Sequence, residues 1–148
     1  MADIREEILA QLLVIAQGIE GIKYAVRNAQ DVPMLTRPAI ILHDGHEELD
    51  TQVGRPDFKG RLQYQTLNPQ FYVFFSSNTK DIGTVASLFR QRLLVAVFND
   101  PTLMGLIVNK QILYQGCTLV PPEVTEARET RLEIELILTY IFRIDDLS

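Results

Sequence analysis

The densest group of potential ligand side chains lies in six consecutive residues, His43-Asp44-Gly45-His46-Glu47-Glu48. Imidazole nitrogens and carboxylate oxygens are ligands that zinc and manganese accept. The chain has 2 histidines, both in this segment, so no further imidazole exists to complete a first coordination shell. Ligands this dense on a short turn cannot all converge on one ion. We therefore interpret the segment as a solvated acidic loop, and we expect neither a metal nor a cofactor.

Nucleophilic catalysis has little support in the sequence. Cys117 is the only cysteine, which excludes an internal disulfide and a multi-cysteine zinc site. It lies in an alternating segment, where a lone cysteine is typically a small, partly buried hydrophobe. A base would have to be His43 or His46, and nothing places either of them near the thiol. The chain also lacks the G-x-S-x-G elbow, the P-loop and the dinucleotide-binding glycine pattern.

A second group of charges lies near the C-terminus, where Arg131, Glu133 and Glu135 occupy alternate positions. In a strand these three side chains share one face. No pocket is implied around them, so the glutamates do not indicate an acid/base pair. The pattern is typical of a solvated or interfacial sheet face, and we predict no catalytic residues and no enzymatic activity.

Composition narrows the class of protein further. The 148 residues fit a single domain, and the 47% hydrophobic and 22% charged fractions are those of a globular protein. With 14 basic and 19 acidic residues the net charge is −5, which argues against a grip on nucleic acid but not against DNA passing nearby. The longest apolar runs, Leu12–Ala16 and Leu93–Phe98, are far shorter than the roughly 20 residues of a membrane span. Acidic residues near the N-terminus also speak against an export signal, so we expect a cytoplasmic origin.

Hydrophobic periodicity predicts two main helices. The first begins at Ile4 with Asp3 as its cap, and Glu6 reaches back as in a capping box; it ends before Gly18. The second is capped by Asn78 or Thr79 and ends before Asn99. Its apolar face is predicted to contain Ile82, Val85, Ala86, Phe89, Leu93, Ala96 and Val97. Asp100 and Pro101 then favour a short further helical turn.

Alternation of apolar and polar residues predicts the strands. Strands are expected at 22–27 and 39–42, followed by a long polar loop over 44–60. Residues 61–75 are extended, with Leu62, Tyr64 and Thr66 alternating first and Phe71, Val73 and Phe75 later. Asn68-Pro69 interrupts them, and the proline, which lacks a donor, marks a bulge, a turn or an edge position. The neighbouring aromatic residues lack the interleaved basic side chains of a base-stacking platform, so we interpret them as core.

The last third of the chain is predicted to be a long hairpin. Its first strand alternates at Ile112, Tyr114, Thr118 and Val120, with Gly116 as a possible bulge. Its second strand, after a charged link over 123–129, alternates at Leu132, Ile134, Leu136, Leu138, Tyr140 and Phe142. The expected fold is α+β: an antiparallel or mixed sheet with two main helices packed on one face.

Several segments together resemble a known family. They are the opening helix followed by Gly-Ile-Glu-Gly-Ile-Lys, the stretch Arg-Pro-Ala-Ile-Ile-Leu-His-Asp-Gly-His-Glu at 37–47, the helix leading into Val97–Leu103, and the last strand ending Arg-Ile-Asp-Asp. In order and spacing the chain resembles the tail terminator, or tail-completion, proteins of long-tailed bacteriophages and gene transfer particles. These are minor tail proteins of α+β fold, and the resemblance extends over nearly the whole chain.

The resemblance implies a structural role in the virion. Copies of the chain would assemble in the host cytoplasm and form a hexameric ring at the head-proximal end of the tail. The ring would stop polymerisation of the tail tube protein and dock the head–tail connector, with DNA only passing through its lumen and no membrane involved. The candidate lumen or docking residues are Asp44, His46, Glu47, Glu48, Asp50, Glu123, Glu126 and Glu129, and the candidate sheet-face contacts are Arg131, Glu133 and Glu135.

Three alternatives stay open from the sequence. One is a neck protein that joins head to tail without terminating the tube. Another is a small cytoplasmic adaptor domain that binds one cellular partner. The third is a hydrolase acting through the histidine-containing segment.

Overall fold

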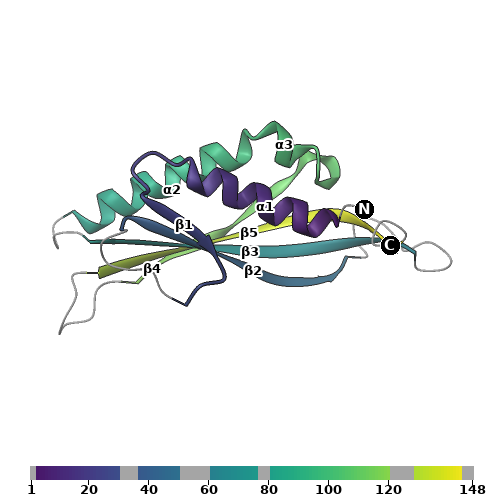
Figure 1. The fold of residues 1–148 in the computed structure, drawn as a ribbon, viewed down its shortest axis with the longest axis horizontal. Helices are drawn as coiled ribbons and strands as arrows, with labels where there is room; N and C mark the ends of the chain where they lie inside the picture. Colours follow the sequence, from purple (N-terminus) through teal and green to yellow (C-terminus); the bar gives the residue numbers. More distant parts are fainter. Residues whose placement is uncertain (1–2, 31–36, 51–60, 77–80, 121–128, 145–148) are drawn as a thin grey trace.

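The fold is a five-stranded sheet carrying its helices on one face (Figure 1). The computed structural model describes residues 3–30, 37–50, 61–76, 81–120 and 129–144. In chain order the elements are α1 (Ile4–Gln17), β1 (Tyr24–Arg27), β2 (Ala39–Leu49), β3 (Leu62–Ser76), α2 (Ile82–Phe98), α3 (Pro101–Met104), the 3-10 helix η2 (Val108–Lys110), β4 (Ile112–Val120) and β5 (Glu129–Arg143). The strand order is β1-β2-β3-β5-β4. The β1–β2 pair is parallel and the other pairs are antiparallel, so the predicted α+β class is confirmed and the sheet is mixed.

Helix α1 confirms the predicted cap but not the capping box. The side chain of Asp3 accepts a hydrogen bond from the backbone N–H of Arg5 at 3.1 Å. Glu6 does not turn back to the helix start, because its carboxylate binds the guanidinium of Arg27 on β1. The predicted apolar stripe faces the sheet, with Ile8, Leu9, Leu12, Ile15 and Ala16 buried.

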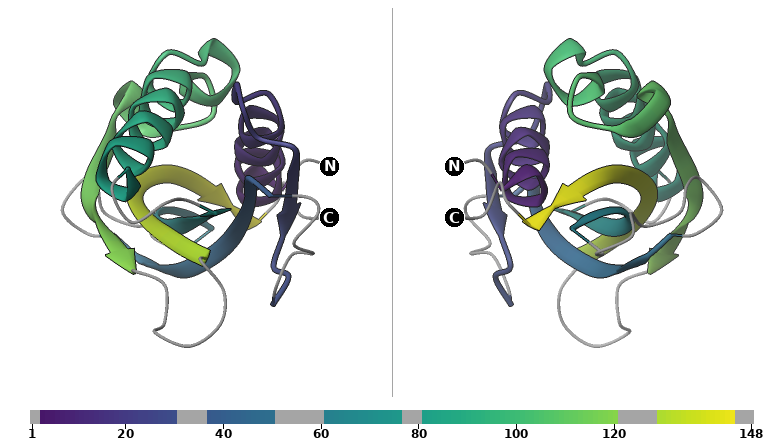
Figure 2. Two further views of the ribbon diagram at one scale, coloured as in Figure 1. Left: turned by 90° about the vertical axis from the view of Figure 1, so that its left-hand side faces the viewer. Right: turned by 90° about the vertical axis from the view of Figure 1, so that its right-hand side faces the viewer.

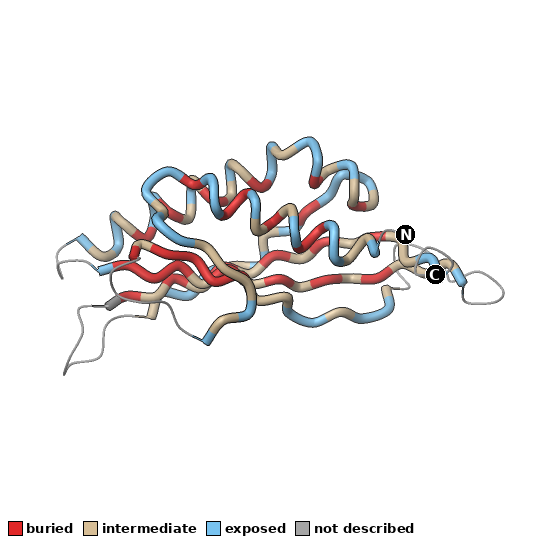
Figure 3. Tube along the Cα trace, viewed as in Figure 1, coloured by how far each residue is buried: buried red, intermediate tan, exposed pale blue. Residues whose placement is uncertain are grey.

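Helix α2 packs on the same face through Ala86, Phe89, Leu93 and Val97. The cap predicted at Asn78 or Thr79 lies outside the described residues, and the helical turns begin at Ile82 with Asp81 as N-cap. Asp100 caps the short helix α3 as predicted, accepting a hydrogen bond from the N–H of Leu103 at 2.8 Å. The two long helices and the sheet enclose one main apolar core, and the buried residues gather between these layers (Figure 3).

The long C-terminal hairpin is confirmed by the pairing of β4 with β5. The even-numbered positions of β5, whose alternation was predicted, face the helices, and Leu132, Ile134, Leu136, Leu138 and Tyr140 are each at most 2% exposed. Fully burying one such side chain contributes about 1.5–3 kcal/mol. This strand is therefore a central support of the core.

The loop predicted over 44–60 is wrong in its first part. Residues 44–49 continue strand β2, which pairs with β3 as far as Leu49. The pairing register shifts between His43 and His46, and Gly45 lies there with φ +76°, a conformation that favours glycine. This bulge inserts an extra residue and breaks the alternation, which hides the strand in the sequence. Residues 51–60 lie outside the described part of the chain.

Strand β3 runs through Asn68 and Pro69 as one element, and Pro69 is buried. The interruption predicted here appears in its pairing with β5, which stops at Leu67 with Leu138 and resumes at Gln70 with Glu135. The bulge of β2 lies opposite this dipeptide, so the sheet is already irregular where proline lacks a hydrogen-bond donor. The helix-facing positions of β3 are odd-numbered throughout. Leu62, Tyr64 and Thr66 therefore lie on the other face from the helices.

A bulge in β4 confirms the irregularity predicted at Gly116 and changes the faces after it. The register with β5 shifts between Tyr114 and Gly116. Beyond it, Thr118 and Val120 pair with Glu133 and Arg131, so the predicted single alternating face is wrong for these two residues. Cys117 is exposed, contrary to the prediction of a partly buried position, because edge strand β4 leaves it uncovered.

Candidate functional site

The sheet has two faces that differ in chemistry. The helix face carries α1 and α2. We call the other one the open face, and define it by the β3 and β5 positions Tyr64, Thr66, Gln70, Tyr72, Arg131, Glu133, Glu135, Ile137 and Thr139. The candidate residues predicted as one acidic loop are divided between these two faces.

Asp44 belongs to an ion-pair cluster on the helix side of β2. Its carboxylate accepts hydrogen bonds from Nε and Nη2 of Arg27 at 3.1 and 2.9 Å. Arg27 Nη1 also donates to Glu6 at 2.6 Å, so one guanidinium joins β1, β2 and α1. Burial alone would raise the pKa of Asp44, but the hydrogen bonds from Arg27 and the positive charge outweigh it and the pKa is lowered. Asp44 is therefore a structural anchor between β1, β2 and α1.

Glu47 is an anchor of the same kind. Its carboxylate accepts a hydrogen bond from the Tyr140 hydroxyl at 2.5 Å and lies 3.1 Å from Nε of Arg5 on α1. Burial, and secondarily the hydrogen bond to Glu47, raises the pKa of Tyr140 above its ordinary value. The network connects α1 to β2 and β5.

His46 and Glu48 are the members of this segment that reach solvent. Their side chains are 76% and 67% exposed and lie 3.5 Å apart. In the described ranges, no three His, Cys, Asp or Glu side chains are grouped as a metal site requires. Asp44 and Glu47 instead bind arginine and tyrosine partners.

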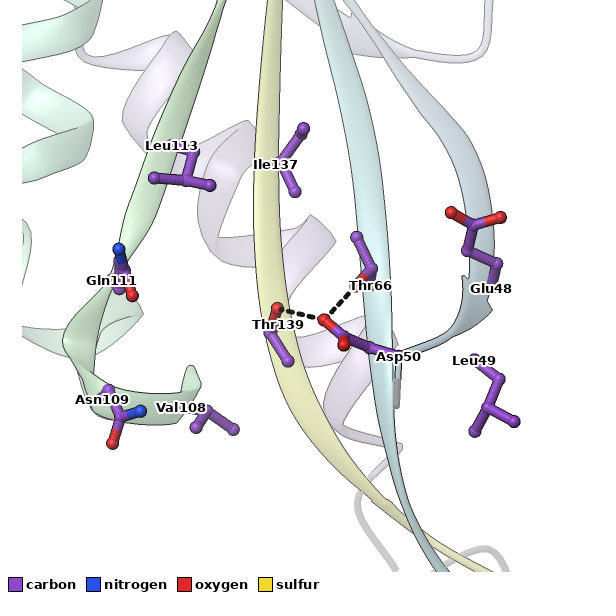
Figure 4. A pocket seen from close by; sticks show the side chains of 10 residues that line it. All are labelled: Glu48, Leu49, Asp50, Thr66, Val108, Asn109, Gln111, Leu113, Ile137 and Thr139. Atoms are coloured by element: carbon purple, nitrogen blue, oxygen red, sulfur yellow. Dashed lines mark hydrogen bonds between the residues drawn. The ribbon is translucent and has the colours of Figure 1, made fainter. Parts of the chain in front are cut away.

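Asp50 borders a hollow of about 410 Å³ on the open face (Figure 4). Its Oδ2 accepts a hydrogen bond from Thr66 Oγ1 at 2.8 Å and a longer one from Thr139 Oγ1 at 3.5 Å. Glu48 and Leu113 also line the hollow, from β2 and β4. The hollow is lined by carboxylate, hydroxyl and amide groups together with the apolar Leu113 and Ile137.

The three predicted sheet-face residues do lie together on the open face. Arg131 Nε lies 2.7 Å from a carboxylate oxygen of Glu133, and its guanidinium stacks 5.3 Å above the ring of Tyr72. Glu135 accepts a hydrogen bond from Gln70 Nε2 at 3.2 Å. Burial, together with the charge of Glu133, raises the pKa of Tyr72. The arrangement is a polar, partly ordered surface with more acid than base.

The remaining predicted residues come from the charged link. Glu123 and Glu126 lie outside the described residues. Glu129 is the first residue of β5, where it pairs with Ser76, so it does not belong to a loop.

No helix in the described part of the chain is long and apolar enough to cross a membrane.

Sequence reasoning missed the two partners that organise this region, Arg5 and Arg27. Both lie on the N-terminal elements, and their spacing in the sequence does not reveal the contacts with β2. It also missed the outer edge of β4, where Leu113 and Leu119 are 50% and 38% exposed. The signal available for β4 was the absence of any charged residue between Ile112 and Val120.

No protein-family model matches the chain, and no curated protein matches its sequence. The function is therefore inferred from the residues and the fold.

Proposed function

We propose that the protein is a structural subunit that closes into a ring at the head-proximal end of a phage-type tail tube. In this role it ends polymerisation of the tube protein and offers a docking face to the head–tail connector. The resemblance to tail terminator proteins implies the phage-type particle, the position at the end of the tail tube and the hexameric ring. The fold supports the proposal through the edges and the open face of its sheet.

One observation carries the proposal: the two edges of the sheet lie on opposite flanks of the subunit. Strand β1 is one edge and β4 is the other, and the end-on views place β1 beside α1 on one flank and β4 beside α2 on the other (Figure 2). A ring requires head-to-tail contacts, in which two different surfaces of each subunit meet those of its neighbours. Two unlike edges facing opposite ways satisfy this requirement.

The open face is suited to a channel that DNA must leave. It carries Glu48, Asp50, Glu133 and Glu135 against two arginines, of which Arg131 is paired with Glu133 and Arg143 lies at the end of β5. Phosphate binds proteins through lysine and arginine that release counterions, and a face with an excess of carboxylates disfavours such binding. We therefore propose that this face is turned to the lumen, with the helices outside.

The experiment is deletion of the gene from its parent phage or prophage, followed by negative-stain electron microscopy of the induced lysate. The proposal predicts over-long, headless tails beside filled heads. Tails of normal length detached from heads would assign a joining role without termination. Normal, infectious particles would refute the virion role and favour a cellular adaptor.

A further inference from the structure

The outer edge of β4 lacks most of the features that prevent an edge strand from pairing with another strand. Within the described chain, no strand pairs with this side of β4. The strand is 9 residues long and contains no charged residue and no proline. Edges of stable monomers are usually protected by lysine, proline, short length or a covering element, and β4 has only the bulge before Gly116. An unprotected edge of this length is a template for another strand.

The side chains along β4 support the same conclusion. Leu113 and Leu119 are 50% and 38% exposed. Leu113 pairs with Ile137 of the open face, and Leu119 pairs with Leu132 of the helix face. Apolar surface is therefore exposed on both sides of the edge, as it is where a sheet continues into a neighbouring subunit.

The opposite edge, β1, has a compatible direction. Strand β1 is parallel to β2, and each step from β2 through β3 and β5 to β4 is antiparallel. Three reversals make β4 antiparallel to β1 within one subunit. In a ring whose strands follow the axis, rotation preserves strand direction, so β4 of one copy meets β1 of the next in the antiparallel sense. Antiparallel pairing is slightly the more stable of the two and needs no change in either strand.

We infer that the outer edge of β4 pairs with the outer edge of β1 in a second copy of this chain, continuing the sheet from subunit to subunit. The net charge of −5 opposes association of identical copies, and β4, which has no charged residue, adds no further repulsion at the contact. Tyr24 of β1 is 42% exposed and provides an aromatic side chain to meet the apolar residues of β4. The inference rests on the proposed ring, and it names the surfaces that close it.

The single natural cysteine allows a direct test. Cys117 lies on β4 and is exposed, and the variant Tyr24→Cys/Cys117→Ser moves the thiol to β1. Each protein is treated with a short bismaleimide, first alone and then as an equimolar mixture. The mixture is expected to give a crosslinked dimer that neither protein gives alone. The single variant Tyr24→Cys, which keeps Cys117, is expected to give a ladder of higher oligomers.

Two results would overturn the inference. A crosslinked dimer of wild-type protein alone would mean that β4 pairs with β4 about a two-fold axis. A protein that light scattering finds monomeric at about 1 mM, where even a weak contact is populated, would mean that the edge does not pair.

A matched pair of variants guards against misfolding. Leu119→Lys places a charge on the β4 edge and is expected to raise the dissociation constant of the oligomer at least about tenfold. Val95→Lys places the same charge on α2, where Val95 is 55% exposed and lies on neither sheet edge, and is expected to leave the constant unchanged. Equal effects of the two variants would refute the edge contact, and circular dichroism verifies that both are folded.

The deletion phenotype separates this inference from the proposed function. Crosslinking between β4 and β1 combined with normal particles in the deletion strain would keep the edge contact and refute the tail role. Over-long tails combined with no crosslink would keep the tail role and refute the edge contact.

Discussion

Arg27 holds Asp44 at two points, with Nε 3.1 Å from Oδ1 and Nη2 2.9 Å from Oδ2. The two side chains are only 22% and 19% exposed, so solvent weakens the pair less than it weakens a surface ion pair. The contact joins β1 to the bulged part of β2, and the apolar β1 residues Ala25 and Val26 are only partly buried against the apolar clusters. The stability of this flank should therefore depend on the pair.

Replacing Asp44 by Asn is expected to lower the free energy of unfolding by about 1–3 kcal/mol, since it leaves the Arg27 guanidinium with a weaker acceptor. Chemical denaturation at neutral pH measures the change. Glu20→Gln is the matched control, because Glu20 is 87% exposed and lies 3.9 Å from Arg92. An exposed pair of this kind contributes little, and an equal loss in both variants would contradict the assigned role of Asp44.

The same pair predicts how stability changes in acid. The pKa of Asp44 is lower in the folded protein than its ordinary value of about 3.9, so its contribution is fully present above that value and disappears as pH falls through the folded pKa. Wild-type protein should lose more stability than Asp44→Asn between about pH 5 and pH 2. Melting temperature followed against pH tests this, and parallel curves for the two proteins would refute it.

Tyr140 predicts a loss of stability in alkali. Burial, and secondarily the hydrogen bond to Glu47, raises its pKa, so the folded protein keeps the phenol neutral. The unfolded chain can release this proton above about pH 10, and stability should therefore fall as pH rises beyond that value. Tyr140→Phe removes this component of the alkaline loss and costs about 1–2 kcal/mol at neutral pH through the lost hydrogen bond.

Tyr24→Phe is the control for this experiment, because Tyr24 is 42% exposed whereas Tyr140 is 1% exposed. Denaturation curves at neutral and at alkaline pH measure both variants. If Tyr140→Phe kept the full alkaline loss of the wild type, Tyr140 would not be its source.

Gly45 predicts the largest effect of a small substitution. A Cβ at this position would lie 1.7 Å from the backbone oxygen of Asn68, and φ is +76°. Gly45→Ala should destabilise the protein by more than about 3 kcal/mol, since backbone on both strands must move. Gly83→Ala on α2, with nothing within 4 Å of the new methyl group, should be neutral or stabilising by up to about 1 kcal/mol. Thermal unfolding of both variants is the measurement, and similar melting temperatures would contradict the bulge geometry.

The sequence was sufficient wherever a regular period continued without interruption. The even-numbered residues from Leu132 to Tyr140 on β5 are buried, as a period of about 2 residues implies. Phe89, Leu93 and Val97 on α2 are buried, as a period of about 3.6 residues implies. Arg131, Glu133 and Glu135 were grouped correctly for the same reason, because alternate residues of one strand share a face. These predictions required no knowledge of distant contacts.

The predictions failed where one residue changed the period or a distant partner decided the outcome. The bulge at Gly45 concealed half of β2, and the bulge before Gly116 moved Thr118 and Val120 to the other face. In the sequence Asp44 resembles a solvent-exposed acid. The fold places Arg27, which is 17 positions away in the chain, beside it. Alternation within a segment contains no information about such a partner.

The bulge in β2 also determines toward which face of the sheet each acidic side chain of this strand points. In an uninterrupted strand, residues three positions apart project to opposite sides, yet Asp44 and Glu47 both reach Arg5 of α1, at 3.7 and 3.1 Å. The extra residue reverses the direction of every later side chain in β2, compared with an uninterrupted strand. Deleting one residue here would exchange the directions of Glu47 and Glu48, so that α1 would lose an anchor and the open face would receive the wrong glutamate. The length of this segment is therefore under tighter constraint than the identity of its exposed residues.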